Sequence, residues 1–437
     1  MVPHWIWQWM DIQGFVLMLS VLLIVKTIWD RPPKNFPPGP FAVPFLGSAL
    51  SINPYDPFGF FCKLLGQYGD VTKLSIGGQR FVLLSGPKTI REVFVEKGDF
   101  FIDRPSYPII EKLFKGLGLI SSSGHMWRQQ RRFTLSTLKY FGVGKKTLET
   151  SILEESRFLY KSIKNEQGKP FDPHYLLYNG VSNIICSLVF GHRFEYGDGH
   201  FHEMLNNFDE IIQLPVTPWG QCKGDTSGFN EENLLYCVID LFAAGTETLS
   251  KTLLWGLLYM VKYPEIQEKV QNEIERVIGQ ERQPSMDDRP SMPYTYAVIH
   301  EIQRFANILP ITPPRVSHYD TTIAGYDIPK GVMVLPLLMP ILYDKSEYQT
   351  ADRFNPEHFL DKEGKFVKRE NVMPFSVGKR MCPGEELARM ELFLFFTSFL
   401  QRFTFRAPDR VKLTMESVIG ITRGPKPFKI CAIPCLK

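Results

Sequence analysis

The chain has 437 residues, of which 44% are hydrophobic and 22% charged, and its formal net charge is +4. This length allows one large domain or two to three small ones, and the composition is that of a globular protein with a large core. The weak positive charge argues against nucleic acid as a partner. The seven cysteines are scattered and lack C-x-x-C spacing, which excludes a disulfide framework and indicates a reducing compartment.

The one segment of membrane length lies near the N-terminus. Residues 13–25 are apolar apart from Ser20, and counting from Gly14 to Trp29 gives 16 residues, slightly short for a spanning helix. Basic residues follow this segment and none precedes it, so the positive-inside rule predicts a single-pass anchor over 1–29 with the rest of the chain in the cytosol. A cleaved signal peptide and a buried core helix are the alternatives.

The next segments predict a linker and then a small sheet. Residues 30–40 contain five prolines and predict a stiff, extended hinge. Residues 70–86 predict a β-hairpin that turns at Gly77 and Gly78. Helical patterns dominate the remainder, so we expect a mainly α fold with a minor β-sheet.

A predicted helix over 125–135 carries Trp127 and Arg131, which are four residues apart and share a face. Considered alone, the tryptophan is a core residue and the arginine belongs to a solvated face. Neighbouring basic residues offer a positive surface to an acidic partner: Arg128, Arg132, Lys139, Lys145 and Lys146.

A longer apolar helix is predicted over 229–262. Between Ala243 and Thr248 it holds a glycine and three polar residues, which are costly inside a buried helix. A ligand lying against the helix is one reason to keep them. A threonine bonded back to its own helix is the alternative.

Another predicted helix, over 294–305, carries Glu301 and Arg304 as an i,i+3 pair. Such pairs are most often found on a protein surface.

The loop over 374–385 contains Cys382, just before an apolar helix predicted over 387–405. The helix dipole and the unpaired N–H groups at a helix N-terminus favour a thiolate. Gly378 and Gly384 allow the backbone to turn sharply and to approach a flat ligand, and Arg380 can pair with an anionic group. A thiolate in these surroundings suits haem iron as an axial ligand, whereas a lone cysteine is most often a buried structural residue.

Five positions of this loop form F-x-x-G-x-R-x-C-x-G: Phe375, Gly378, Arg380, Cys382 and Gly384. The pattern resembles the haem-ligating loop of cytochrome P-450 enzymes. The resemblance covers nearly the whole chain and is closest to the microsomal family 2, with features of the subfamily J fatty-acid epoxygenases. It implies the cytochrome P-450 fold, with 41–437 as a haem-thiolate catalytic domain behind an N-terminal transmembrane helix.

The resemblance also implies the cofactor and the residues that hold it. Cys382 would ligate the iron of haem b. The haem propionates would be contacted by an arginine and tryptophan set that matches the family's motifs: Arg104, Trp127, Arg131, Arg315 and Arg380.

Further roles follow from the same resemblance. Glu247 and Thr248 match the family's acid–alcohol pair, which assists O2 activation and relays protons, beside a glycine that opens a groove for O2. Glu301 and Arg304 match a buried network that supports the cysteine loop, in which the family often has arginine where this chain has His358. Substrate-pocket positions would be Ala243, Ala244, Ile308, Ile311, Thr312 and Ile419.

The implied function is a haem-dependent monooxygenase that inserts one oxygen atom of O2 into an apolar substrate: a fatty acid, a steroid or a xenobiotic. Electrons would come from NADPH through a flavoprotein reductase, with cytochrome b5 as a second candidate donor. The implied location is the endoplasmic reticulum membrane, in contact with lipid, with the catalytic domain in the cytosol and no nucleic-acid partner.

The chain departs from the family between Trp127 and Thr248. Only 121 positions separate them, about sixty fewer than the family pattern implies. The Pro- and Gly-rich stretch over 213–228 leads straight into the long helix, so we expect two helices that roof the substrate pocket to be missing near 221–222. The alternative function is therefore a haem-binding membrane protein with weak or no turnover. A scaffold without haem would require the cysteine loop to be a coincidence.

Overall fold

The structure is a computed structural model that describes residues 12–29, 32–53, 56–106, 111, 114–213 and 230–435. The chain divides into two compact units. The first combines residues 1–105 with 311–337, and the second combines 106–310 with 338–437. Residues 41–437, predicted as one catalytic domain, are therefore shared between both units.

The first unit is built on a four-stranded sheet with the order β1-β2-β6-β3. Its strands are β1 (Val71–Ile76), β2 (Gln79–Leu84), β3 (Arg315–Val316) and β6 (Met333–Pro336). β1 and β2 are antiparallel, whereas β2 and β6 are parallel. Gly77 and Gly78 have φ values of 55° and 81°, as a two-residue hairpin turn requires, so the hairpin predicted over 70–86 is confirmed.

The other elements of this unit are short. A separate hairpin joins β4 (Thr321–Ile323) to β5 (Tyr326–Ile328). The helical segments outside the N-terminal region are η1 (Ala49–Ser51), α3 (Pro57–Tyr68), α4 (Pro87–Arg91) and η2 (Glu92–Glu96).

The N-terminal region contains α2 (Ile12–Trp29). Residues 1–11 of the predicted anchor lie outside the described residues. Within the described part of the chain, no helix has both the length and the apolar character needed to span a membrane. Residues 32–40 of the predicted hinge form no helix, because proline cannot continue one.

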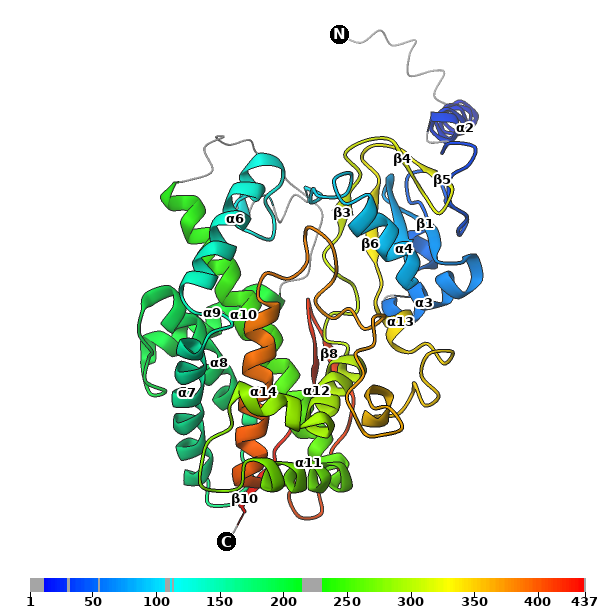
Figure 1. Ribbon diagram of the computed structural model, residues 1–437. Helices are drawn as coiled ribbons and strands as arrows, with labels where there is room; N and C mark the ends of the chain where they lie inside the picture. Colours follow the sequence, from blue (N-terminus) through cyan, green and yellow to red (C-terminus); the bar gives the residue numbers. More distant parts are fainter. Residues whose placement is uncertain are drawn as a thin grey trace. The chain divides into compact units, whose positions relative to one another are not determined.

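The second unit is mainly helical (Figure 1). Its helices are α6 (Gly124–Tyr140), α7 (Lys146–Asn165), α8 (Pro173–Phe190), α9 (Gly199–Gln213), α10 (Glu231–Lys262), α11 (Pro264–Val277), η3 (Met286–Ser291), α12 (Pro293–Ala306), α13 (Met339–Leu342), η4 (Pro356–Phe359) and α14 (Glu385–Arg402). Its strands form two pairs: β7 (Phe403–Arg406) with β10 (Cys431–Pro434), and β8 (Ser417–Ile419) with β9 (Arg423–Pro425). The prediction of a mainly α fold with a minor sheet is confirmed.

α10 is the longest helix and packs against α8, α12 and α14. The Asn230 side chain caps it by accepting a hydrogen bond from the N–H of Asn233. Its C-terminal half is buried in the core, where Trp255 and Tyr259 stack with ring centroids 5.4 Å apart. The prediction of a long helix over 229–262 is confirmed from Glu231 onward, while position 229 lies outside the described residues.

The apolar helix predicted over 387–405 begins earlier and ends earlier than expected. α14 covers Glu385–Arg402, and Phe403 already belongs to β7. Phe403 and Phe405 are buried at every second position and pair with β10. The strand period of two therefore replaces the helical period at this point.

Candidate haem-thiolate site

Cys382 lies in the loop before α14, and its N–H donates a hydrogen bond to the Phe375 carbonyl at 2.9 Å. Gly378 has φ = 79°, a conformation that costs glycine little and other residues more. This turn places the cysteine just before the first residues of α14. Burial raises the pKa of the Cys382 thiol, the Gly384 N–H opposes the rise, and Glu385 and Arg131 act in opposite directions.

Arg380 joins the cysteine loop to the segment before α6. Its guanidinium carbon lies 3.9 Å from the centroid of the Trp127 ring. Its two terminal nitrogens donate to the carbonyl oxygens of Leu119 at 3.2 Å and Ser122 at 2.5 Å. Both Arg380 and Trp127 are buried. The tryptophan is therefore a buried residue that packs against the arginine, as its core interpretation predicts, while its contact with a propionate stays a prediction.

Arg131 reaches the same loop from α6. Its Nη2 donates to the Met381 carbonyl at 2.7 Å, and its guanidinium carbon lies 5.6 Å from the Trp127 ring centroid. Burial lowers the pKa of Arg131, and Cys382 opposes this change. Three of the predicted propionate contacts, Trp127, Arg131 and Arg380, are thus brought together beside the residues that flank Cys382.

The other two predicted propionate contacts, Arg104 and Arg315, belong to the first unit. Arg104 Nη1 donates to the carbonyl oxygens of Pro313 at 2.7 Å and Pro314 at 2.8 Å. Arg315 is buried, with its guanidinium carbon 4.7 Å from the Phe94 ring centroid.

The polar stretch of α10 has an exposed side and a buried side. Ala244 is exposed, and Ala243 and Thr248 are partly exposed. Thr248 Oγ1 donates to the Ala244 carbonyl at 2.7 Å, which is the bond to its own helix that the sequence left open. A Cβ added at Gly245 would lie 2.6 Å from Ile185 Cδ1 of α8, so the glycine allows this isoleucine to pack closely against α10.

Glu247 is buried and held by two residues that the sequence analysis missed. The Thr422 hydroxyl donates to Glu247 Oε1 at 2.8 Å, and Lys251 forms an ion pair with the same oxygen. Lys251 Nζ also lies 3.0 Å from Thr422 Oγ1. The i,i+4 spacing of Glu247 and Lys251 on α10 could have predicted their ion pair from the sequence. For the β8–β9 turn, the resemblance placed Ile419 in the same pocket as two alanines of α10, but it did not identify Thr422 as a partner of Glu247.

The predicted network around Glu301 is buried and closed. Arg304 makes a bidentate ion pair with Glu301, with both N–O distances 2.7 Å, and neither side chain is exposed. His358 Nδ1 lies 3.3 Å from the Glu301 carboxylate, and its Nε2 lies 2.9 Å from Thr350 Oγ1. The Asn355 N–H donates a hydrogen bond to Glu301 Oε1 at 2.8 Å. Histidine thus occupies a place in the network where the family often has arginine.

The predicted substrate-pocket positions fall in both units. In the second unit, Ile308 is partly exposed and its carbonyl accepts from the Arg423 N–H at 2.7 Å. In the first unit, Ile311 pairs with Leu337 in an isolated bridge, and the buried Thr312 hydroxyl has no hydrogen-bond partner among the described residues. Ile419 ends β8, and its side chain lies outside the description.

The residues beside Cys382 fit a haem. Burial raises the pKa of the Cys382 thiol, which is opposite to the effect expected from the helix N-terminus, but a metal ion deprotonates a coordinating thiol outright. The loop contributes Arg380 and α6 contributes Arg131, and guanidinium groups are the side chains that bind carboxylates best. Within the described part of the chain, no cluster of three or more histidine, cysteine or acidic residues offers a different metal site.

Comparisons with known proteins identify the family of this chain. The model of the family "Cytochrome P450" matches residues 37–222 and 220–432. Cytochrome P450 2J1 of Oryctolagus cuniculus is 44% identical over 481 positions, which cover 96% of this chain and 95% of the relative. Cytochrome P450 2J2 of Homo sapiens is 44% identical over 476 positions, which cover 95% of each protein. Cytochrome P450 2H2 of Gallus gallus is 39% identical, with 97% of this chain and 100% of the relative covered.

The alignments also bear on the shortened middle of the chain. The two matched segments meet at 220–222. For the Oryctolagus cuniculus protein, 96% of 437 residues is about 420, so about 60 of the 481 aligned positions have no residue of this chain.

The family model matches most of the sequence, and the relatives align with nearly all of this chain and nearly all of their own length. These comparisons lead to one conclusion. The chain belongs to the cytochrome P450 family and is an oxidoreductase of the monooxygenase type.

Proposed function

We propose that this protein is a haem-thiolate monooxygenase that inserts one oxygen atom of O2 into an apolar substrate, with fatty acids as the first class to test. The observation that carries the proposal is the position of Cys382 at the start of α14, with Arg131 and the Arg380–Trp127 pair beside it. When bound, the haem supplies the O2 activation and oxygen insertion. The reason for testing fatty acids first is the resemblance of the sequence motifs to the subfamily J fatty-acid epoxygenases.

The residues have distinct tasks in this proposal. Cys382 provides the axial ligand, supported by Phe375, Gly378 and Gly384 in its loop. The propionates are held by the residues that match the family motifs: Arg104, Trp127, Arg131, Arg315 and Arg380.

Proton delivery is assigned to α10. The Thr248 oxygen donates its hydrogen to Ala244 and keeps its lone pairs free to accept from a water molecule. Glu247 is held in one place by Lys251 and Thr422. A fixed carboxylate that precedes a hydroxyl residue in the same helix turn would be suited to passing protons if water molecules connect the two side chains.

The electron donor would be a flavoprotein reductase that uses NADPH, with cytochrome b5 as a second donor. Support comes from exposed basic residues on α6, in the loop after it and at the first position of α7: Arg128, Arg132, Lys139, Lys145 and Lys146. Such residues attract an acidic partner and speed the encounter.

The location would be the endoplasmic reticulum membrane, with the anchor over 1–29, the hinge over 30–40 and the catalytic part in the cytosol. The exposed apolar side chains of α2, which include Phe15, Leu17 and Leu22, support this placement. The basic residues that follow them favour the cytosolic side.

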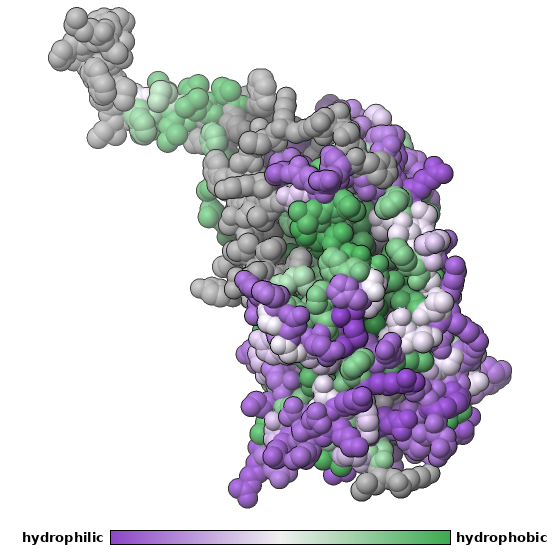
Figure 2. Space-filling model, turned by 90° about the vertical axis from the view of Figure 1, so that its left-hand side faces the viewer, coloured by the Kyte–Doolittle hydropathy of each residue, from purple (hydrophilic) through white to green (hydrophobic). Residues whose placement is uncertain are grey.

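The missing segment near 221–222 would shorten the roof of the substrate pocket. One face of the molecule displays an area of hydrophobic side chains bordered by hydrophilic ones (Figure 2). Near the start of α10, the neighbouring Leu234 and Leu235 are 58% and 56% exposed, and adjacent exposed apolar side chains indicate a surface that another segment would cover. We therefore expect weaker substrate binding and looser coupling than in a relative that has the full segment.

The test is reconstitution of the full chain with haem, reductase, NADPH and a fatty acid. The proposal predicts oxygenated product that depends on both NADPH and reductase. A haem-loaded sample that consumes NADPH without forming product from any of the three substrate classes would contradict it. That result would favour the alternative of a haem-binding membrane protein without useful turnover, which the relatives do not favour.

A further inference from the structure

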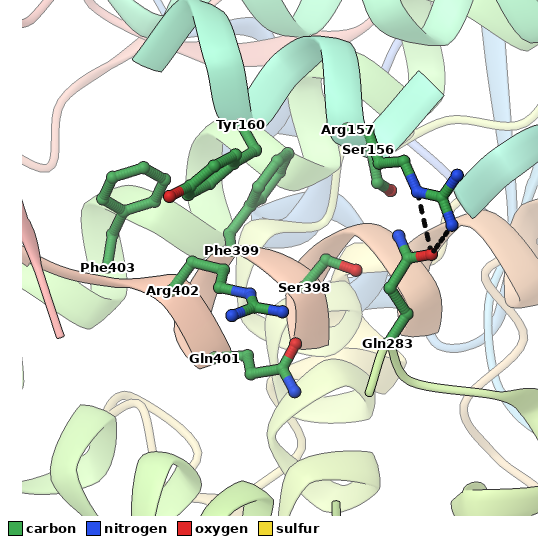
Figure 3. A pocket seen from close by; sticks show the side chains of 9 residues that line it. All are labelled: Ser156, Arg157, Tyr160, Gln283, Ser398, Phe399, Gln401, Arg402 and Phe403. Carbon is green, nitrogen blue, oxygen red and sulfur yellow. Dashed lines mark hydrogen bonds between the residues drawn. The ribbon is translucent and has the colours of Figure 1, made fainter. Parts of the chain in front are cut away.

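A cavity of about 320 Å³ lies in the second unit where α14 ends, between α14, α7 and the segment before η3 (Figure 3). α14 has 18 residues and is therefore about 27 Å long. Cys382 precedes its N-terminus and the cavity adjoins its C-terminus. The cavity is therefore separate from the proposed haem site.

The lining of the cavity is positively charged. Arg157 enters from α7 and Arg402 from the last turn of α14, and none of the described lining residues is acidic. Arg157 donates to Gln283 Oε1 through Nε at 3.0 Å and Nη2 at 2.6 Å. The neutral amide orients this guanidinium without neutralising it. No ion pair of Arg402 occurs among the described residues, and its side chain is only partly exposed.

Two serine hydroxyls in the lining have no hydrogen-bond partner within the described part of the chain. They belong to Ser156 of α7 and Ser398 of α14. Ser156 is only 4% exposed. Buried hydroxyls are nearly always hydrogen-bonded, but neither oxygen is open to solvent here, so a ligand would bond to them only after the two side chains turn towards the cavity.

One wall of the cavity is aromatic. The rings of Tyr160 and Phe403 lie 5.4 Å apart with an interplanar angle of 34°, and Phe399 adds a buried ring to the lining. A flat apolar body packs well against such a wall. The volume is at the lower end of the range for ligand pockets, which leaves room for a small ligand.

We propose that this cavity binds a small organic oxyanion, namely a phosphate or carboxylate attached to a flat ring. Arg157 and Arg402 hold the anionic group, and the hydroxyls of Ser156 and Ser398 donate to it. The ring packs on Tyr160 and Phe403. This site is independent of the proposed oxygenation, because none of its residues belongs to the cysteine loop, α6 or α10.

The experiment measures binding of phenyl phosphate, benzoate, inorganic phosphate and phenol to the full-length, haem-loaded protein by calorimetry. Phenyl phosphate or benzoate should bind at least about 10-fold more tightly than phenol, because charge-assisted hydrogen bonds are lost with the neutral ligand. The comparison of phenyl phosphate with benzoate identifies which oxyanion is preferred. Inorganic phosphate should bind more weakly than phenyl phosphate if the aromatic wall contributes.

Variants assign the binding to this cavity. Arg402→Gln should weaken phenyl phosphate or benzoate binding about 10-fold or more. Arg406→Gln changes an exposed arginine at the end of β7 and should leave the affinity unchanged. Ser156→Ala should weaken binding severalfold without lowering the melting temperature, since no internal hydrogen bond is lost. If Arg402→Gln does not fold, the affinity of Ser156→Ala for phenyl phosphate or benzoate tests the proposal instead. Equal affinity for phenol, no binding by a folded sample, or oxyanion binding that neither variant changes would overturn the proposal.

Discussion

The central carbon of the Arg380 guanidinium lies 3.9 Å from the centroid of the Trp127 ring. Arg380 comes from the cysteine loop and Trp127 from α6. The same guanidinium bonds to the Leu119 and Ser122 carbonyls. One side chain therefore ties the loop that presents Cys382 to the segment that leads into α6.

Replacing Arg380 should loosen this connection. Arg380→Met removes two charge-assisted hydrogen bonds and one cation–π contact, and should lower the free energy of unfolding by roughly 2–4 kcal/mol. Denaturant unfolding measures the change. Arg132→Met removes an exposed arginine of α6 and should alter stability by less than about 0.5 kcal/mol. Equal stability of the two variants would show that Arg380 does not connect the two segments.

We expect a larger loss of stability when the Glu301–Arg304 pair is broken. Both side chains are fully buried, and removing one charge leaves the other unpaired in the interior. Glu301→Gln should therefore lower the free energy of unfolding by about 3–5 kcal/mol. The matched control is Glu357→Gln, which changes an exposed glutamate of η4. If Glu301→Gln unfolds no earlier than Glu357→Gln, the network does not support the fold.

His300 makes stability depend on acidity. Its Nδ1 lies 2.9 Å from the Tyr296 carbonyl and its Nε2 lies 3.2 Å from Arg389 Nη1. Burial is the main cause that lowers the pKa of His300 from 6.5 to about 3. The unfolded chain therefore binds a proton in a range where the folded protein does not.

Acidification should destabilise the folded protein through His300. The contribution of neutral His300 is fully present above pH 6.5 and is lost as the pH falls towards 3, by up to about 1.4 kcal/mol per pH unit. His300→Gln keeps a polar side chain and removes this titration, so its stability should fall less steeply below pH 6.5. His200→Gln changes an exposed histidine and should behave like the wild type. A wild-type slope in the His300 variant would refute the assignment.

Lys251 is expected to be a positioning residue for Glu247. It is only 19% exposed and forms its ion pair next to Thr422. Without the cation, Glu247 would lose its fixed position. Lys251→Met should then lower the ratio of product formed to NADPH consumed about 3- to 10-fold, because proton transfer depends on the placement of the acid.

The readout separates this role from a purely structural one. A structural defect would lower haem content and product in proportion, whereas mispositioning of Glu247 lowers product per NADPH at full haem content. Lys169→Met, an exposed lysine outside α10, serves as the control. An unchanged ratio in Lys251→Met would rule out the positioning role.

Local chemistry made several features predictable. The adjacent Gly77 and Gly78 predicted the β1–β2 hairpin, because a two-residue hairpin turn requires the positive φ angles that these glycines adopt. The spacing of Glu301 and Arg304 placed the pair on one helix face, although burial of that pair came only from the resemblance to the family. The end of α14 was misplaced, because Phe403 and Phe405 are apolar in either a helical or a strand pattern.

Other features depend on contacts between distant parts of the chain. Thr422 is 175 positions from Glu247, and sequence spacing says nothing about how the β8–β9 turn meets α10. The oxyanion cavity likewise combines Ser156, Gln283 and Arg402 from three segments. Such sites become visible only when packing has brought the segments together.

The most direct test of the central claim is the absorption spectrum of the reduced carbon monoxide complex of the full-length protein. We expect the red-shifted Soret band that thiolate-ligated haem gives, retained in Cys431→Ser, which changes a partly buried cysteine of β10, and lost in Cys382→Ser. A wild-type protein that binds no haem, or a Cys382→Ser variant that keeps the same band, would contradict the assignment of Cys382 as the axial ligand.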